Sequence, residues 1–166
     1  MKIAIISDTH DNVPNLEKAL AWMKKNNIEQ IIHCGDLCAP SILVETLGPG
    51  FAGPMHMVFG NVEDRETLIE KVADFDQVKH YGDQGEATLD GKKIAFTHFP
   101  EEGRQLAASG KYDYVFYGHT HKPWEEKVGR TRLVNPGTLA GLFAKATFAV
   151  YDTEADKLEL IILEKI

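Results

Sequence analysis

The sequence predicts an α/β fold in which two packed mixed sheets carry helices on their outer faces. In the first half of the chain, short β-branched runs alternate with segments of helical periodicity, which is the order of β-α-β units with parallel strands. In the second half, a hairpin is followed by segments that alternate like antiparallel strands. A chain of 166 residues, with 43% hydrophobic and 26% charged residues, also has the size and composition of one soluble domain, residues 1–166.

The first half contains apolar runs that are continuous rather than alternating. Continuous β-branched runs are typical of parallel strands that are buried on both faces. Between them, apolar residues recur at helical spacing, and Pro14 suits the first turn of a helix. The expected strands are 3–6, 30–34 and 55–59, and the expected helices are 14–26, 40–47 (ended by Gly48-Pro49-Gly50) and 64–73.

The second half begins with a hairpin signal. Asp90-Gly91 fits a type I′ turn, and Gly110 fits the end of a helix. The part from Trp124 onwards alternates in the manner of antiparallel strands. The expected elements are strands 86–89 and 93–96, helix 101–109, and strands 112–117, 130–134, 147–151 and 157–163.

Charge and hydropathy narrow the class of protein. The formal net charge of −7 disfavours binding to nucleic-acid backbones, although it leaves room for a locally positive metal site. No apolar stretch approaches the roughly 18 residues that a membrane-spanning helix needs, so no membrane partner is expected. Cys34 and Cys38 are expected to be reduced, which together with the absence of a leader-like apolar segment indicates the cytoplasm.

Polar side chains with metal-binding chemistry follow five of the expected strands. Ligands of open α/β sheets bind at the carboxyl ends of the strands. Each residue alone is also a common turn or helix-cap residue, so the inference rests on the coincidence across strands. Gly35, Gly60 and Gly118 precede members of the set and permit close backbone approach. The set is Asp8, His10, Asp36, Asn61, His98, His119 and His121.

The chemistry of this set indicates two metal ions rather than one. Two carboxylates, four imidazoles and one amide suit Mn, Fe, Zn, Ni or Mg, and the absence of a thiolate disfavours a structural zinc site. Seven donors are too many for one tetrahedral ion, whereas two ions about 3.5–4 Å apart that share a carboxylate would use them all. Two divalent ions against two carboxylates leave a net positive site, which favours a phosphate substrate.

The motifs in this order resemble the calcineurin-like metallophosphoesterase superfamily, and in particular its small prokaryotic phosphodiesterase branch. The resemblance covers almost the whole chain and includes the Ile-Ser-Asp-Thr-His-Asp-Asn opening. The motifs that carry it are Asp8-Thr9-His10, Gly35-Asp36, Gly60-Asn61, His98, Gly118-His119-Thr120-His121 and Asn135-Pro136-Gly137-Thr138.

The resemblance implies a four-layer α/β/β/α sandwich with a dinuclear metal centre, in which metal-activated water hydrolyses phosphodiester bonds. Manganese is favoured among Mn, Ni, Fe, Zn and Mg, and a small phosphodiester is the expected substrate. Asp36 would bridge the ions, Asp36, Asn61 and His98 would act in catalysis, and Asn12 would orient a phosphate oxygen. One ion would be held by Asp8, His10, Asp36 and His121, and the other by Asp36, Asn61, His98 and His119.

The sequence departs from the family pattern at two places. Val62 stands where many members carry a histidine that protonates the leaving group, and Glu63 follows it. A general acid typically contributes about 10²–10⁴-fold, so poor leaving groups are expected to react slowly here. The second departure is His98-Phe99-Pro100, where relatives commonly have His-Gly-His. It leaves the shape of the substrate pocket open.

Two alternatives to a phosphodiesterase stay open at this point. A phosphomonoesterase could use the same site, although the residue at position 62 disfavours it. The second alternative is a non-catalytic scaffold of the same fold, because the branch that the chain resembles is also similar to a eukaryotic retromer subunit. The complete set of donor residues favours an enzyme over this scaffold. The sequence leaves the oligomeric state open, a homo-oligomer included.

Overall fold

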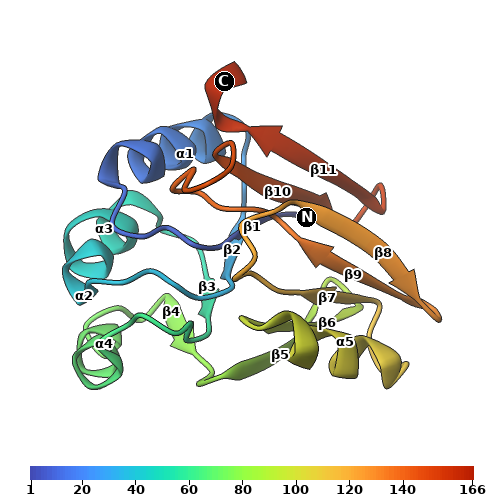
Figure 1. Cartoon of the computed structure of the whole chain (residues 1–166). Helices are drawn as coiled ribbons and strands as arrows, with labels where there is room; N and C mark the ends of the chain where they lie inside the picture. Colours follow the sequence, from blue (N-terminus) through green and yellow to red (C-terminus); the bar gives the residue numbers. More distant parts are fainter.

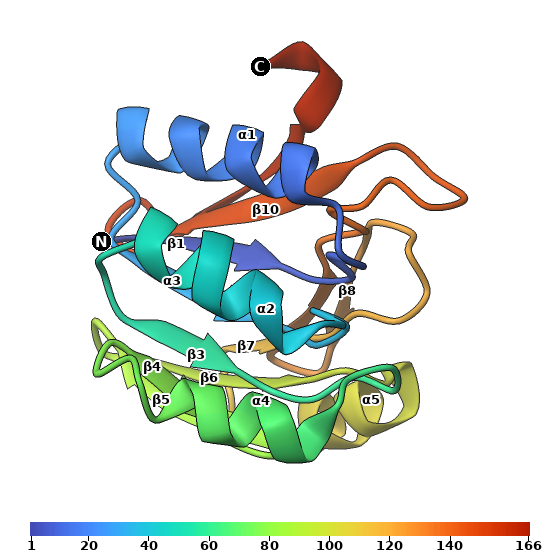
Figure 2. The ribbon, with the colours of Figure 1, turned by 90° about the vertical axis from the view of Figure 1, so that its left-hand side faces the viewer.

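The computed structural model describes residues 1–166 and arranges them in four layers, with two sheets packed face to face and helices on both outer faces (Figure 1). The predicted α/β/β/α architecture is confirmed. Figure 2 shows α1 above the first sheet, and α5 beneath the second. None of the helices combines the length and the hydropathy that a membrane span requires.

The first sheet combines a parallel half and an antiparallel half. The parallel strands are β1 (Lys2–Ile6), β2 (Gln30–His33), β3 (Met55–Met57) and β4 (Val78–His80). On the other side of β1, β10 (Thr147–Asp152) pairs antiparallel, and β11 (Lys157–Ile162) pairs antiparallel with β10. The order is therefore β11-β10-β1-β2-β3-β4.

The second sheet is built around two parallel strand pairs. Strand β7 (Tyr114–Phe116) pairs parallel with both β6 (Lys92–Thr97) and β9 (Thr131–Asn135). The edge strands β5 (Gln84–Leu89) and β8 (Trp124–Val128) pair antiparallel with β6 and β9. The order is β5-β6-β7-β9-β8.

The helices cover the outer face of each sheet. Three apolar clusters match the layers: one joins α1 and the α2–α3 segment to the first sheet, one lies between the sheets, and one joins α5 to the second sheet. The helices are α1 (Val13–Lys25), α2 (Pro40–Ile42), the π-helical turn η1 (Leu43–Leu47), α3 (Gly48–Gly50), α4 (Arg65–Val72), α5 (Pro100–Ala108) and the 3-10 turn η2 (Leu163–Lys165).

Strand β1 shows why the apolar runs are continuous. Ala4 and Ile6 lie in the helix-facing cluster, whereas Ile3 and Ile5 lie in the cluster between the sheets. Successive side chains of a strand point to opposite faces, and both faces of this strand are covered. Full burial of an isoleucine side chain stabilises the fold by about 1.5–3 kcal/mol.

The structure differs from the prediction at a few elements. Helical structure continues through Gly50, because a π-helical turn bonds the N–H of Gly48 to the carbonyl of Leu43, and Gly48 fits against the ring of Phe75. Strands β4 and β8 were not among the expected ranges. Strands β10 and β11 come from the second half of the chain, but β10 pairs with β1 and β11 pairs with β10, so they extend the first sheet.

The two sheets present the carboxyl ends of their parallel strands at one edge of the molecule. Figure 2 shows β1 and β3 pointing to the same side. There the backbone N–H of Asp8 donates to the carbonyl of Gly35, and the N–H of Gly118 donates to the carbonyl of His98. The loops that follow these strands are therefore fastened to one another within each sheet.

Candidate metal centre

The loops at this edge hold several donor residues in left-handed backbone conformations. Non-glycine residues rarely adopt such conformations, because each costs of order 1–3 kcal/mol and persists only where the surrounding structure enforces it. Such outliers cluster at functional sites. The donor residues with positive φ are Asp8 (53°), His10 (42°), Asp36 (58°), His119 (68°) and His121 (58°).

Glycines let these loops approach one another closely. A Cβ on Gly60 would lie 2.0 Å from Oδ1 of Asp36, and a Cβ on Gly118 would lie 2.8 Å from Oδ2 of Asp8. A Cβ on Gly35 would lie 2.6 Å from the backbone nitrogen of Gly60. The glycines before the donor residues are thus required by space, as the sequence predicted.

Two histidines and two carboxylates form the first group of donors. Nε2 of His121 lies 3.1 Å from Oδ1 of Asp8 and 3.2 Å from Nε2 of His10. Nε2 of His10 lies 3.6 Å from Oδ2 of Asp36. These atoms come from loops after β1, β2 and β7, and they face a common point.

The second group of donors begins at the same carboxylate. Nε2 of His98 lies 3.4 Å from Oδ2 of Asp36 and 3.1 Å from Oδ1 of Asn61. Nδ1 of His119 lies 3.0 Å from the same amide oxygen and 3.3 Å from Nε2 of His98. The structure therefore brings together all seven donor residues that the sequence singled out.

Three of the donor histidines are oriented by a contact of Nδ1, the ring nitrogen that faces away from the cluster. Nδ1 of His98 lies 2.8 Å from the carbonyl oxygen of Cys34, and Nδ1 of His121 lies 3.1 Å from that of Leu142. Nδ1 of His10 lies 3.4 Å from Sγ of Cys38. Donation from Nδ1 leaves Nε2 with a free lone pair, which is the arrangement of metal-ligating histidines.

The hydrogen bonding of the Asp8 carboxylate indicates whether a cation fits the cluster. Oδ2 accepts a hydrogen bond from the N–H of His119 at 3.1 Å, but Oδ1 is buried without a hydrogen-bond partner. A buried carboxylate oxygen is costly unless a positive group faces it. Together with the nitrogen and oxygen donors around it, this oxygen fits a divalent ion.

The pKa values of the cluster follow from burial and mutual charge. Burial is the largest single effect on the pKa of Asp36 and would raise it, but the contact with His98, the N–H of Asn61 and the nearby His10 together lower that pKa overall. The contact with Asp8 raises the pKa of His10 above its usual value. Burial opposes protonation of His98, but Asp36, together with Asp8 and the carbonyl of Cys34, more than compensates, so the pKa of His98 is raised. The carboxylate between the histidines is therefore ionised.

A buried histidine outside the donor set holds two of the ligand loops. Nε2 of His33 lies 2.9 Å from Oγ1 of Thr9, and Nδ1 accepts a hydrogen bond from the N–H of Gly35 at 3.1 Å. Burial lowers the pKa of His33 to about 4, so the ring is neutral. Its role is to fix the loop after β1 against the loop after β2.

Position 63 also connects two loops. The carboxylate of Glu63 accepts hydrogen bonds from the N–H of Leu37 at 3.0 Å and from the N–H of Gly60 at 2.9 Å. The neighbouring Val62 is 47% exposed, and its N–H lies 3.3 Å from Oδ1 of Asp36. The side chain at position 62 thus lies at the rim of the cluster, and because it is a hydrocarbon it has no proton to donate to a leaving group.

Asn12 occupies a structural position. Its side-chain oxygen caps α1 by accepting from the N–H of Asn15 at 3.1 Å, and its amide donates to the carbonyl of Ala140 at 3.0 Å. Both polar groups of this side chain thus bond within the chain. Its expected contact with a phosphate oxygen stays a prediction, and the proposal below does not use it.

Sequence reasoning missed three residues that lie beside the donor histidines. Sγ of Cys38 lies 3.4 Å from Nδ1 of His10, and the carbonyl oxygen of Leu142 lies 3.1 Å from Nδ1 of His121. The ring of Phe143 lies nearly parallel to the imidazole of His121, with 6.2 Å between centroids. The contacts join segments far apart in sequence, which no local pattern reports.

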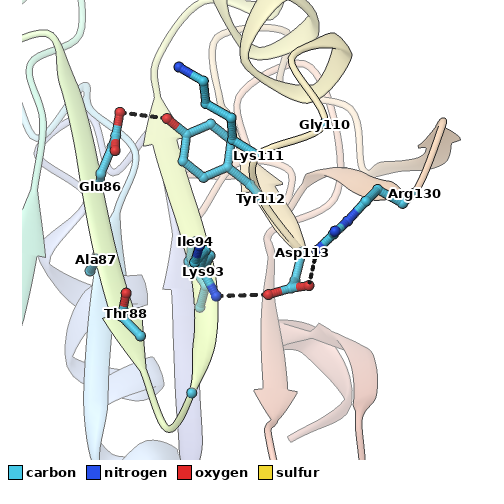
Figure 3. Close-up of a pocket in the computed structure, with 11 residues that line it drawn as sticks. Glu86, Ala87, Thr88, Lys93, Ile94, Gly110, Lys111, Tyr112, Asp113 and Arg130 are labelled. Atoms are coloured by element: carbon cyan, nitrogen blue, oxygen red, sulfur yellow. Dashed lines mark hydrogen bonds and ion pairs between the residues drawn. The ribbon is translucent and has the colours of Figure 1, made fainter.

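A cavity of about 870 Å³ lies elsewhere, at the amino ends of β6, β7 and β9 (Figure 3). Several of its polar groups are paired with each other: Tyr112 donates to Glu86, and Asp113 accepts from the N–H of Lys93 and from Arg130. These pairs connect β5, β6 and the loops before β7 and β9. The cavity is at the opposite end of the second sheet from the donor cluster.

Comparisons with known proteins identify the relatives of the chain. The family model of the calcineurin-like phosphoesterase superfamily domain matches residues 1–156. A phosphodiesterase of Methanocaldococcus jannaschii is 33% identical over 168 residues, covering 99% of this chain and 100% of the relative. The solved structure of an archaeal phosphodiesterase has a TM-score of 0.89 at 31% identity and covers 98% of this chain and 99% of its own.

A more distant structure shares the fold. Vps29 of Entamoeba histolytica, solved with Zn²⁺, has a TM-score of 0.69 at 18% identity, covering 98% of this chain and 99% of that protein. The match of the family model to most of the chain and the full-length relative establish the family. The chain belongs to the calcineurin-like phosphoesterase superfamily, and it is a hydrolase of phosphoric esters.

Proposed function

We propose that the protein is a dinuclear metal-dependent phosphodiesterase in which Asp36 would be a ligand of both ions. The observation that carries this proposal is the position of one oxygen. Oδ2 of Asp36 lies 3.6 Å from Nε2 of His10 and 3.4 Å from Nε2 of His98, which belong to the two donor groups. A carboxylate shared between two such groups is the arrangement expected of paired catalytic ions.

The donor residues divide between two ions of this kind, with Mn²⁺ favoured among Mn, Ni, Fe, Zn and Mg. When bound, the ions lower the pKa of water and neutralise charge on the phosphoryl oxygens. Asp8, His10, Asp36 and His121 would hold one ion, and Asp36, Asn61, His98 and His119 the other.

The residues of the chain position these donors. Hydrogen bonds from the N–H groups of Asn61 and Val62 to Oδ1 of Asp36, at 2.8 and 3.3 Å, leave Oδ2 free to face both donor groups. The carbonyl of Cys34 holds the ring of His98 with Nε2 directed at the cluster. Such preorganisation avoids rearrangement during the reaction.

A diester is favoured over a monoester by the side chain at position 62. Protonation of the leaving group helps most when that group is a poor one. Val62 supplies no proton, so esters with good leaving groups, such as aryl diesters, are the substrates that the site serves best. The reaction breaks one phosphorus–oxygen bond, water supplies the new oxygen, and the leaving group departs as an alcohol or phenol.

The test combines metal content with turnover. Protein treated with a chelator and reloaded with Mn²⁺ or Ni²⁺ is expected to hold two ions per chain and to hydrolyse bis(p-nitrophenyl) phosphate. Asp36→Asn is expected to lower both metal content and kcat/KM, the latter by more than about 100-fold, because it weakens both donor groups. The matched control is Asp74→Asn, an exposed carboxylate on the surface after α4.

Two results would overturn the proposal. Metal content of one ion per chain under saturating conditions would remove the dinuclear centre. Absence of turnover with every divalent ion tried, in a protein that binds metal, would favour the scaffold alternative over a phosphodiesterase.

A further inference from the structure

The loop from Leu139 to Ala146 places an aromatic ring outside the folded core and beside the donor cluster. Phe143 is 98% exposed, the largest exposed fraction among the large hydrophobic side chains, and Leu142 next to it is 42% exposed. A buried phenylalanine would contribute to folding, but this ring gains no burial. Packing within the chain therefore does not account for an aromatic side chain at this position.

The backbone at this ring is also strained. Phe143 has φ of 60°, in the left-handed region that bulky side chains rarely adopt. The ring is not packed within the chain, and glycine or asparagine would adopt this backbone conformation with less strain. Neither packing nor the turn therefore explains an aromatic residue here. Strained conformations of this kind are found at ligand-binding and catalytic sites.

The base of the loop is fastened to the loop that carries Asp8. The N–H groups of Leu139 and Ala140 donate to the carbonyls of Ser7 and Asp8, and Oγ1 of Thr138 also donates to the carbonyl of Asp8. Figure 2 shows the segment that leads into β10 extending on the side to which β1 points. The position of the ring relative to the donor cluster is thus set by hydrogen bonds.

One donor histidine connects the ring to the cluster. Nε2 of His121 faces Asp8, whereas Nδ1 lies 3.1 Å from the carbonyl oxygen of Leu142. The ring of Phe143 lies nearly parallel to the imidazole of His121, with 6.2 Å between centroids and 22° between planes. A group attached to a phosphate at the cluster would pass beside the exposed face of this aromatic ring.

Other loops add apolar groups at the rim. The ring of Phe99 packs against His98 and His119, with centroid distances of 5.1 and 4.9 Å. Val62, exposed at 47%, follows Asn61. Apolar side chains from three loops thus border the donor cluster.

We infer that Phe143 is a specificity-determining residue that stacks against a flat aromatic substituent of the substrate, such as an aryl group or a nucleobase. This inference rests on the proposed function. A diester has two ester groups, so one can leave while the other stays on the phosphate and is bound by the chain. Stacking of a base or aryl ring on an aromatic side chain is largely independent of the identity of that ring.

The experiment compares two diesters with the same leaving group. p-Nitrophenyl phenyl phosphate retains a phenyl group, and methyl p-nitrophenyl phosphate retains a methyl group. In Phe143→Ala, the ratio of kcat/KM for the phenyl ester to that for the methyl ester is expected to fall about tenfold, with the loss in KM. Phe143→Trp is expected to keep the wild-type ratio, because it keeps a flat ring.

Binding provides a readout that is independent of turnover. Calorimetry with the metal-loaded protein is expected to show that Phe143→Ala weakens phenyl phosphate relative to methyl phosphate by a similar factor. The control variant is Ile69→Ala, which removes a side chain that is 46% exposed on α4, away from the ligand loops, and should leave both ratios unchanged. Because the ring of Phe143 is exposed, its replacement should not unfold the protein, which thermal unfolding checks.

The outcomes separate the two proposals. Equal losses on both diesters, or an unchanged ratio, would overturn the role of Phe143 in specificity while leaving the phosphodiesterase intact. If Phe143→Ala changed the sedimentation coefficient and left both ratios unchanged, the ring would belong to a protein interface and the inference would be wrong. If the wild type hydrolysed neither diester, the proposed function would fail, and calorimetry alone would decide the stacking contact.

Discussion

The carboxylate of Asp8 accepts a hydrogen bond from the backbone N–H of His119 at 3.1 Å, across 111 residues of chain. Asp8 follows β1 in the first sheet, and His119 follows β7 in the second. The bond therefore joins the carboxyl ends of the two sheets, and it leaves Oδ1 of Asp8 buried without a hydrogen-bond partner. Assembly of the donor cluster thus depends on the packing of one sheet against the other.

Asp8→Asn is expected to separate the stability of the fold from the binding of metal. In the presence of a chelator the variant should be at least as stable as the wild type, because it removes a buried charge and retains an acceptor for His119. Added Mn²⁺ at about 100 times its dissociation constant should stabilise the wild type by about 2.7 kcal/mol, and the variant by less. Thermal unfolding with and without Mn²⁺ measures both effects. Equal stabilisation by Mn²⁺ would show that Asp8 is not a ligand.

Gly60→Ala is expected to damage the site through a steric clash. The new Cβ would lie 2.0 Å from Oδ1 of Asp36, so the carboxylate or the backbone must move. We expect kcat/KM to fall more than about tenfold and the free energy of unfolding to fall by about 1–3 kcal/mol.

Gly91→Ala is the matched control for this clash. Gly91 has φ of 77° in the hairpin turn, and a Cβ there would meet nothing within 4 Å. The substitution should cost about 1–2 kcal/mol of stability through backbone strain and leave kcat/KM unchanged. Equal kinetic effects of the two variants would argue against a steric role for Gly60.

Val62→His is expected to supply the missing proton donor. The rate should rise most for substrates with poor leaving groups, monoesters of aliphatic alcohols among them, and least for p-nitrophenyl diesters. The measurement is the slope of log kcat/KM against leaving-group pKa, which should become shallower in the variant. An unchanged slope would refute the reasoning that position 62 limits the choice of leaving group.

The stability of the metal-free protein is expected to fall below about pH 6.5, partly through His80. Burial, and secondly Arg65, lower the pKa of His80 to about 4. Between these two values the unfolded state binds the proton and the folded state does not, so stability falls as the pH falls, by at most about 1.4 kcal/mol per pH unit for this group.

The comparison variant is His80→Asn, whose side-chain oxygen can still accept the hydrogen bond that Gly82 donates to Nδ1 of His80. Denaturant unfolding from pH 7 to pH 4 with a chelator present should give a smaller pH slope for the variant. Parallel curves for the two proteins would show that His80 does not titrate in this window.

Local patterns in the sequence predicted elements whose causes are local. The turn at Asp90-Gly91 formed as expected, because both residues adopt positive φ, as a type I′ turn requires. Asp64 caps α4 by accepting from the N–H of Thr67, at the start of the predicted helix 64–73. The helix from 40 was predicted to end too early, because contact of Gly48 with Phe75 is a tertiary effect that outweighs the local breaker signal.

The sequence by itself determined which side chains lie at the carboxyl ends of the strands, since strand ends and turn residues are local properties. Tertiary structure decided that β10 pairs with β1, that Asn12 caps a helix, and which nitrogen of each donor histidine faces the cluster. It also placed Phe143 beside His121. Pairing between distant segments and the direction of a ring depend on packing and hydrogen bonds across the two sheets, and no local pattern of residues encodes these.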